Sequence, residues 1–173
     1  MKRRNAMAVL FLLLLALAIW RVAGGHHSRS TTPHVQARYY FTAEEAYVDI
    51  QVIDSRLVVT YLPKTFRRES FNYQGQRPWY SQRDLRHATA SLTDRELTQF
   101  INLVKSTGFL ELPQSCGTTL KARYYPYKIS VKIDGKENAV TYRSRPSAPP
   151  MPQAFAKVQD WLMAMAKAKM KDF

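Results

Sequence analysis

The sequence predicts an α+β fold: an antiparallel β-sheet with two α-helices packed on one face, preceded by an N-terminal apolar signal or anchor helix. Residues 46–62 and 127–142 have the alternating pattern of β-hairpins, and a helical pattern follows later in the chain after each of them. Antiparallel strands followed by single helices are typical of an α+β layer. The third observation is Ala6–Trp20, a run of fifteen residues without a charge.

The N-terminal segment has the features of an export signal, because basic residues at positions 2–4 precede the apolar run Ala6–Trp20. Cleavage near Gly25 would give a secreted or periplasmic protein. Retention would anchor the protein in the membrane through Ala6–Trp20, with its N-terminus in the cytoplasm. A helix buried in the folded domain is the third interpretation. In the first two cases we expect an extracytoplasmic protein.

Composition divides the chain into three parts: residues 1–25 as signal peptide or anchor, 26–37 as a flexible linker, and 38–173 as a single α+β domain. Without residues 1–25, the chain keeps 22 basic residues against 13 acidic ones. This excess favours contact with a protein partner or an anionic surface, although solubility alone also explains it. Cys116 is the only cysteine, so an intrachain disulfide is excluded.

The first hairpin is predicted by Val48, Ile50 and Val52, which alternate with polar residues before a turn at 54–56. Residues 57–62 are apolar and β-branched enough to form the returning strand, which Pro63 ends. The next thirty residues give weaker patterns. We expect a short strand around Phe71 and Tyr73 and a further strand over residues 80–90.

Four signals predict one helix over residues 92–108. Thr93 and Glu96 form a capping box, and Leu92 and Leu97 have the spacing of a hydrophobic staple. Gly108 suits the left-handed residue that ends a helix. The apolar stripe that would face the sheet consists of Leu97, Phe100, Ile101 and Val104.

The second hairpin and the second helix follow the same logic. Asp134 and Gly135 suit a tight turn with positive φ, and residues 139–142 return as the paired strand. The side chains that point to one face are Tyr127, Ile129, Val131 and Ile133. After the proline-rich residues 146–152, a helix begins whose apolar stripe is Phe155, Val158, Trp161, Leu162 and Met165.

Two helices on one face leave the other face of the sheet as a wet or contact surface. We expect it to carry Lys128, Ser130 and Lys132, with several of Asp49, Gln51, Arg83 and Arg86. Basic and aromatic residues also interleave along the chain, as at residues 38–40, a composition that suits partner recognition. Strands enriched in aromatics with Arg on their wet side are the plainer interpretation. The candidate contact surface is Arg67, Arg68, Arg77, Trp79, Tyr80, Arg123, Tyr124, Tyr125, Lys128, Lys132 and Arg143.

Residues 92–162 resemble the second half of emfourin-type proteins, small inhibitors of thermolysin-like metalloproteases. The resemblance rests on the layout of three segments: a helix ending in residues 103–113 (LVKSTGFLELP), a strand over residues 127–136 (YKISVKIDGK), and a closing helix. Residues 26–50 lack the glycine-rich start of those inhibitors. The resemblance implies protease inhibition as an alternative function and assigns no inhibitory residue.

The sequence offers no catalytic, cofactor or metal site with convincing spacing. His26, His27 and His34 fall in the expected linker, where a rigid second shell for a metal is absent. Cys116 and His87 are the remaining candidates for a nucleophile and its base. A single cysteine and a single histidine in a chain of this length are seldom close enough in space to react together. We therefore predict a non-catalytic extracytoplasmic interaction or accessory domain, membrane-tethered or secreted, with no cofactor and no nucleic-acid partner.

Overall fold

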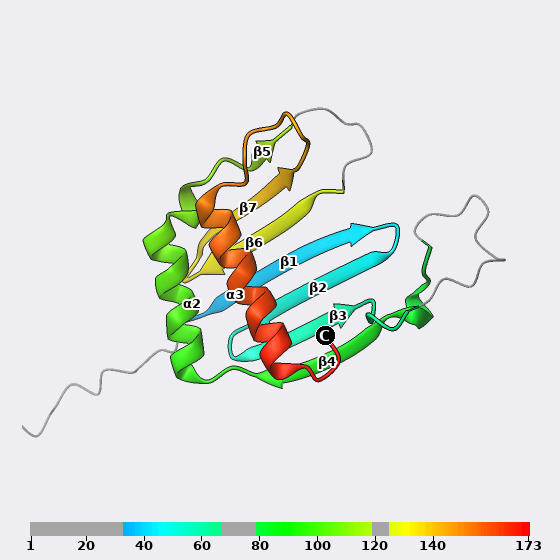
Figure 1. The fold of residues 1–173 in the computed structure, drawn as a ribbon. Helices are drawn as coiled ribbons and strands as arrows, with labels where there is room; N and C mark the ends of the chain where they lie inside the picture. The colour runs from blue at the N-terminus through cyan, green and yellow to red at the C-terminus, as the bar shows by residue number, and fades with distance from the viewer. Residues whose placement is uncertain (1–32, 67–78, 119–124) are drawn as a thin grey trace, which may run out of the picture. The chain divides into compact units, whose positions relative to one another are not determined.

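The computed structural model describes residues 33–66, 79–118 and 125–173, and Pro33–Phe173 forms one compact unit (Figure 1). It is an α+β fold, as predicted. Seven strands form one sheet in the order β4-β3-β2-β1-β6-β7-β5. The strands are β1 (Val35–Ala43), β2 (Ala46–Ile53), β3 (Arg56–Tyr61), β4 (Arg86–Ser91), β5 (Ser115–Gly117), β6 (Tyr127–Ile133) and β7 (Lys136–Arg143). The α-helices are α2 (Asp94–Thr107) and α3 (Gln153–Lys169), with 3-10 turns η1 (Gln82–Asp84) and η2 (Phe109–Glu111).

The sheet is mixed, which corrects the prediction of a purely antiparallel one. β5 pairs with β7 in parallel, whereas the other strand pairs are antiparallel. β5 has only three residues, which is too short for an alternating pattern to predict it. Gly117 ends it at φ 83°, and a Cβ there would lie 2.1 Å from the carbonyl oxygen of Arg143. Only glycine therefore permits this close approach between β5 and β7.

The sheet's central strand, β1, begins within the residues that we expected to form the linker. Val35 is fully buried and Ala37 is 5 % exposed. Both turns next to β1 also bond to its start, because the backbone N–H of Asp54 donates to the Val35 carbonyl and that of Asp134 to the His34 carbonyl. The ordered domain therefore starts before residue 38.

The core lies between the sheet and the two helices, and α3 crosses the sheet in Figure 1. Along β1, β2 and β3 every second side chain points to this covered face, as the two-residue period of strands requires. Helix side chains fill the space opposite. The largest fully buried ones in the helices are Phe100 and Val104 of α2 and Phe155 and Leu162 of α3. The prediction of two helices on one face is confirmed.

Helix α2 begins and ends as predicted. Thr93 accepts from the backbone N–H of Glu96, while the Glu96 carboxylate accepts from the Thr93 N–H at 2.8 Å. Gly108 adopts the left-handed conformation at φ 71°. The capping glutamate also meets α3, because Lys169 Nζ lies 2.9 Å from Glu96 Oε1. These contacts lower the pKa of Glu96, first through the Thr93 backbone N–H and then through Lys169.

The two predicted hairpins are also present. β2 and β3 pair around Asp54 and Ser55, and β6 and β7 pair around Asp134 and Gly135. Both aspartates have positive φ, 54° and 49°. Asparagine and aspartate tolerate this conformation better than other side chains with a Cβ, which is why they favour such turns.

The middle third of the chain differs in part from the prediction. Residues 86–91 form β4, but residues 82–84 form η1 instead of extending the strand. The 3-10 turn places Arg83 outside the sheet, and the register pairs Arg86 with Tyr61 on the covered side. Neither arginine therefore joins the predicted polar face. The expected strand around Phe71 and Tyr73 lies outside the described residues.

The predicted signal or anchor segment, Ala6–Trp20, also lies outside the described residues. In the parts of the chain that the structure describes, none of the helices combines the length and apolar character needed to span a bilayer.

Candidate interaction surface

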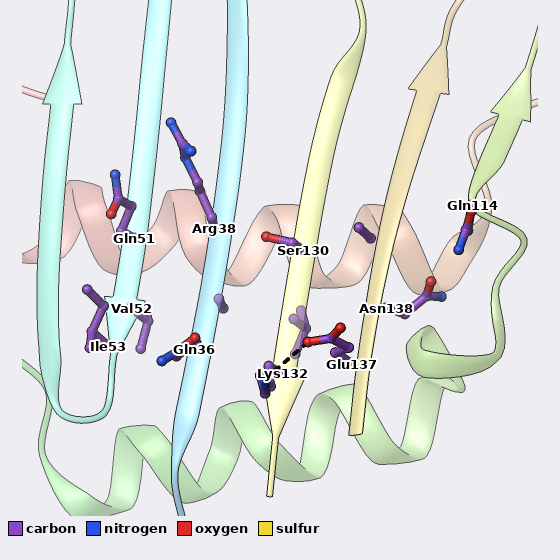
Figure 2. Close-up of a pocket in the computed structure, with 13 residues that line it drawn as sticks. Gln36, Arg38, Gln51, Val52, Ile53, Gln114, Ser130, Lys132, Glu137 and Asn138 are labelled. Atoms are coloured by element: carbon purple, nitrogen blue, oxygen red, sulfur yellow. Dashed lines mark ion pairs between the residues drawn. The ribbon is translucent and has the colours of Figure 1, made fainter. Parts of the chain in front are cut away.

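The sheet has a second face that α2 and α3 do not cover, which we call the open face. Figure 2 views it with α3 behind the strands and polar side chains in front. The antiparallel registers place residues of five neighbouring strands on this face in matching rows. Its members include Gln36, Arg38, Tyr40, Asp49, Gln51, Ile53, Arg56, Val58, Thr60, Lys128, Ser130, Lys132, Glu137, Ala139, Thr141 and Arg143.

The open face is hollowed over β1, β6 and β7. One hollow of about 610 Å³ extends from Gln36 and Ile53 to Gln114, and a second of about 390 Å³ continues to Tyr40 and Thr141. Both include Arg38, Ser130 and Ala139, so they form one depression, which we call the trough. Ser130 and Ala139 are register partners with short side chains, and the surrounding residues are longer. The trough exists because of this difference in side-chain length.

A two-point ion pair forms one wall of the trough. Arg38 Nε donates to Asp49 Oδ1 at 2.8 Å, and Arg38 Nη2 donates to Asp49 Oδ2 at 2.7 Å. Gln51 Nε2 adds a third hydrogen bond to the same carboxylate at 3.2 Å. Asp49 is only 5 % exposed, whereas half of the Arg38 side chain remains accessible. Hydrogen bonding to Asp49 raises the pKa of Arg38, so the guanidinium stays charged and fixed in orientation.

Tyr40 lies beside two cations at the next level of the sheet. The Arg38 guanidinium carbon is 5.4 Å from the centre of the Tyr40 ring, and Lys128 Nζ is 5.9 Å from it. Both distances are within the range of cation–π attraction. Among the described residues no carboxylate lies within ion-pair distance of Lys128. The ring therefore holds the ammonium group near the trough and leaves its charge uncompensated.

Two further cations lie on the open face: Lys132 borders the trough, and Arg143 lies outside its lining. Lys132 Nζ lies 3.3 Å from Glu137 Oε2, drawn as the dashed line in Figure 2, and both side chains are well exposed. Arg143 Nη1 is 3.5 Å from the Ser115 hydroxyl. An exposed ion pair contributes little to stability, so Glu137 is easily exchanged for another anion.

Residues that follow the gap at 67–78 cover one end of the open face. The Tyr80 hydroxyl hydrogen-bonds to that of Thr42, and its ring meets Tyr47 edge-on at 5.9 Å. Tyr80 and Leu85 are buried but do not belong to the main core. Burial raises the pKa of both Tyr47 and Tyr80. This small cluster packs over Thr42 and Tyr47 on the open face.

The structure brings only part of the candidate contact surface together. Lys128, Lys132 and Arg143 share the open face, and Tyr125 is 40 % exposed just before β6. Tyr80 is 8 % exposed and supports the sheet end, while Trp79 is half-buried, with its backbone N–H bonded to the Glu44 carbonyl. The remaining candidates, Arg67, Arg68, Arg77, Arg123 and Tyr124, lie outside the described residues.

Sequence reasoning placed Lys128 and Lys132 on the contact surface but omitted Arg38 and Tyr40, which also line the trough. Arg38 and Tyr40 stood in an interleaved run but were not chosen, because β1 was not recognised as a strand. The alternation of Val35, Ala37 and Tyr39 with Gln36 and Arg38 was the signal that identifies both the strand and its outward side chains.

Two kinds of candidate chemistry, a metal cluster and the pair Cys116 and His87, can be sought in the described residues. Within residues 33–66, 79–118 and 125–173, no three His, Cys, Asp or Glu side chains gather as metal ligands. Cys116 lies beside Tyr142 on the covered side, and burial raises the pKa of its thiol. His87 lies on β4, where it bonds to Thr60 of β3, and β4 and β5 are the two opposite edge strands of the sheet. The nucleophile and base candidates are therefore not brought together.

Comparison with known proteins adds no assignment to this geometry. No family model matches the sequence, and no curated protein is significantly similar to it.

Proposed function

We propose that this protein is a non-catalytic interaction module that acts outside the cytoplasmic membrane, either tethered through Ala6–Trp20 or released, and that its open face binds an anionic partner. The observation that carries the proposal is the trough, a polar hollow bordered by Arg38, Lys128 and Lys132 on a sheet face that the described helices leave bare. A hollow of this size is within the range of ligand-binding clefts.

The charge balance of the open face supports an anionic partner. Its described basic residues are Arg38, Arg56, Lys128, Lys132 and Arg143, and its carboxylates are Asp49 and Glu137. Asp49 is buried and already engaged by Arg38, so it contributes little negative potential to an incoming ligand. A cleft with an excess of one charge raises the local concentration of opposite charge and speeds association.

The experiment compares two charge-reversed proteins with the same net charge. The full chain in non-ionic detergent is titrated with poly-L-glutamate and, separately, with polygalacturonate. One variant carries Lys128→Glu and Lys132→Glu on the open face. The control carries Lys157→Glu and Lys167→Glu at exposed positions of α3. We expect the open-face variant to lose about tenfold or more in affinity for the polyanion that binds, and the control less than about threefold.

Equal losses in the two variants would mean that binding follows net charge and not the open face, which contradicts the proposal. So would the absence of binding by the unaltered chain to either polyanion at low salt. Affinity that falls with rising salt in the unaltered chain, and falls less steeply in the open-face variant, is the expected signature of the basic border.

Metalloprotease inhibition is our second candidate. The observation that favours it is that α2, β6 and α3 follow one another in this order along the chain, as do the helix, strand and closing helix on which the resemblance to emfourin-type inhibitors rests. The test is to add the full chain in stoichiometric excess to a thermolysin-like protease. Inhibition supports this candidate, and an unchanged hydrolysis rate removes it.

A further inference from the structure

The cations of the trough repeat with the period of the strand itself. Lys128, Ser130 and Lys132 are alternate residues of β6 and point to the open face. Arg38 of β1 is the register partner of Ser130, so it adds a cation at the level between the two lysines. Strands rise about 3.3 Å per residue, which places successive levels about 6.6 Å apart. The trough therefore presents three positive levels over about 13 Å.

The trough runs in the same direction as these levels. Its first hollow includes Gln36 and Lys132, and its second includes Tyr40 and Lys128, with Ser130 and Ala139 shared by both. Because the floor is made of short side chains, a ligand lying along β6 reaches all three levels without displacing a bulky residue.

We propose that the trough binds an extended acidic segment of a partner protein, with carboxylates at alternate positions opposite Lys128, Arg38 and Lys132. This inference rests on the proposed function. An extended peptide places every second side chain on one side at a repeat of about 6.6 Å, which matches the spacing of the cationic levels. Neither a compact anion nor a flat anionic surface has this repeat.

Each cation retains the capacity to bind a carboxylate. Arg38 uses two of its five N–H donors on Asp49 and keeps the others, on an accessible side chain. Lys132 exchanges an exposed Glu137 for the ligand. Lys128, whose described contact is the Tyr40 ring, gives up no ion pair among the described residues and is the strongest anchor.

The neutral side chains of the trough suit a peptide backbone. Gln36, Gln51 and Gln114 border it from three strands or their ends, as Figure 2 shows, and Ser130 lies between them. Gln51 Nε2 donates to Asp49, and its amide oxygen accepts no hydrogen bond within the described part of the chain. Amide side chains offer both donors and acceptors, as peptide groups require.

The first experiment varies the spacing of charge at constant composition. Three nine-residue peptides of threonine and glutamate, each with three glutamates, are titrated against the full chain in non-ionic detergent. The glutamates stand at alternate positions in the first peptide, adjacent in the second, and four residues apart in the third. We expect the alternating peptide to bind at least fivefold more tightly than the other two.

The second experiment fills the trough without changing its charge. Ala139→Leu places a larger side chain on the floor, and Thr89→Leu is the control at an exposed position of β4 outside the trough. We expect Ala139→Leu to weaken binding of the alternating peptide at least fivefold and Thr89→Leu to leave it unchanged.

A third variant removes one charge from the trough. Lys128→Gln, an exposed substitution that does not alter packing, should weaken binding of the alternating peptide at least threefold.

The outcomes separate the two proposals. Equal affinity for the three peptides overturns the alternating spacing but leaves the anionic partner. Tighter binding to polygalacturonate, or to vesicles of phosphatidylglycerol in a detergent-free reconstitution, than to the alternating peptide overturns the peptide in favour of a polysaccharide or a membrane surface. Failure of all of these probes to bind removes both proposals.

Discussion

The two faces of the sheet come from the same strands but have opposite chemistry. On the covered face, alternate side chains of β1, β2 and β3 pack against α2 and α3 and include fully buried Val35, Ile50 and Val59. On the open face, the intervening side chains are mostly polar and gather around Arg38 and Asp49. One strand thus supplies both the core and the candidate binding surface, because its side chains alternate in direction.

The difference teaches where stability and specificity lie in this protein. Removal of apolar area from water stabilises the covered face, and any side chain of similar size and polarity serves nearly as well there. The open face depends on particular charges and hydrogen bonds, and its Asp49 costs free energy to bury unless Arg38 accompanies it. Substitutions should therefore lower stability on one face and change binding on the other.

The largest expected effect breaks the covered face. Phe155 is fully buried between α3 and the sheet, so Phe155→Ala should lower the free energy of unfolding by about 3–5 kcal/mol. Ile53→Ala is the matched truncation on the open face, where Ile53 is 45 % exposed, and should cost less than about 1 kcal/mol. Urea unfolding of both variants measures the difference. Similar losses of unfolding free energy in the two variants would mean that Ile53 on the open face is also packed in a core, which contradicts this contrast.

The next prediction tests whether the ion pair between Arg38 and Asp49 also stabilises the fold. Arg38→Met leaves the buried Asp49 carboxylate with Gln51 as its remaining described side-chain donor, which should cost about 1–3 kcal/mol of unfolding free energy. Adding Asp49→Asn removes the stranded charge and should recover part of that loss. Urea unfolding of the single and double variants measures both. A double variant that is no more stable than Arg38→Met would contradict the argument.

A smaller effect concerns the junction of α2 with α3 on the covered side. Glu96→Gln keeps a capping acceptor but removes the ion pair with Lys169, so we expect a loss of about 0.5–1 kcal/mol at neutral pH. The pKa of Glu96 is lowered in the folded protein, so its contribution is present above the unfolded pKa of about 4.3 and disappears as pH falls through the folded value.

The measurement is unfolding at several pH values between 7 and 2. The difference between the unaltered protein and Glu96→Gln should shrink toward zero at the acid end. Lys169→Gln is the control, because it removes the same pair from the other partner and should show the same acid limit. A difference that persists at the lowest pH would assign the effect to the cap and not to the charge.

Sequence reasoning located the strong local patterns and missed what depends on long-range pairing. The capping box, Gly108 and the Asp134–Gly135 turn are contacts within a few residues, and all three are present in the structure. β5 is too short for periodicity, and its parallel pairing with β7 depends on a glycine whose role appears only when Arg143 lies beside it. Local pattern carries no information about such an approach.

The candidate surface was only partly predictable for the same reason. The period of β6 was enough to place Lys128 and Lys132 on one face. Arg38 reaches the level between them only because β1, separated from β6 by more than eighty residues, pairs with it. Basic and aromatic interleaving alone did not distinguish accessible Lys128 from buried Tyr80, because composition is silent about burial.

The smallest expected effect compares thiols on the two faces. Cys116 lies on the covered side next to Tyr142, and burial raises the pKa of its thiol, so a smaller fraction is thiolate at pH 8. Ala139→Cys in a Cys116→Ser background places a thiol on the exposed floor of the trough. Alkylation by iodoacetamide should be several-fold slower for Cys116 than for the thiol of Ala139→Cys. The rate for Cys116 should also keep rising to a higher pH before it levels off. Equal rates would show that solvent reaches the covered side at β5 as freely as it reaches the trough. The covered face would then extend only as far as β7.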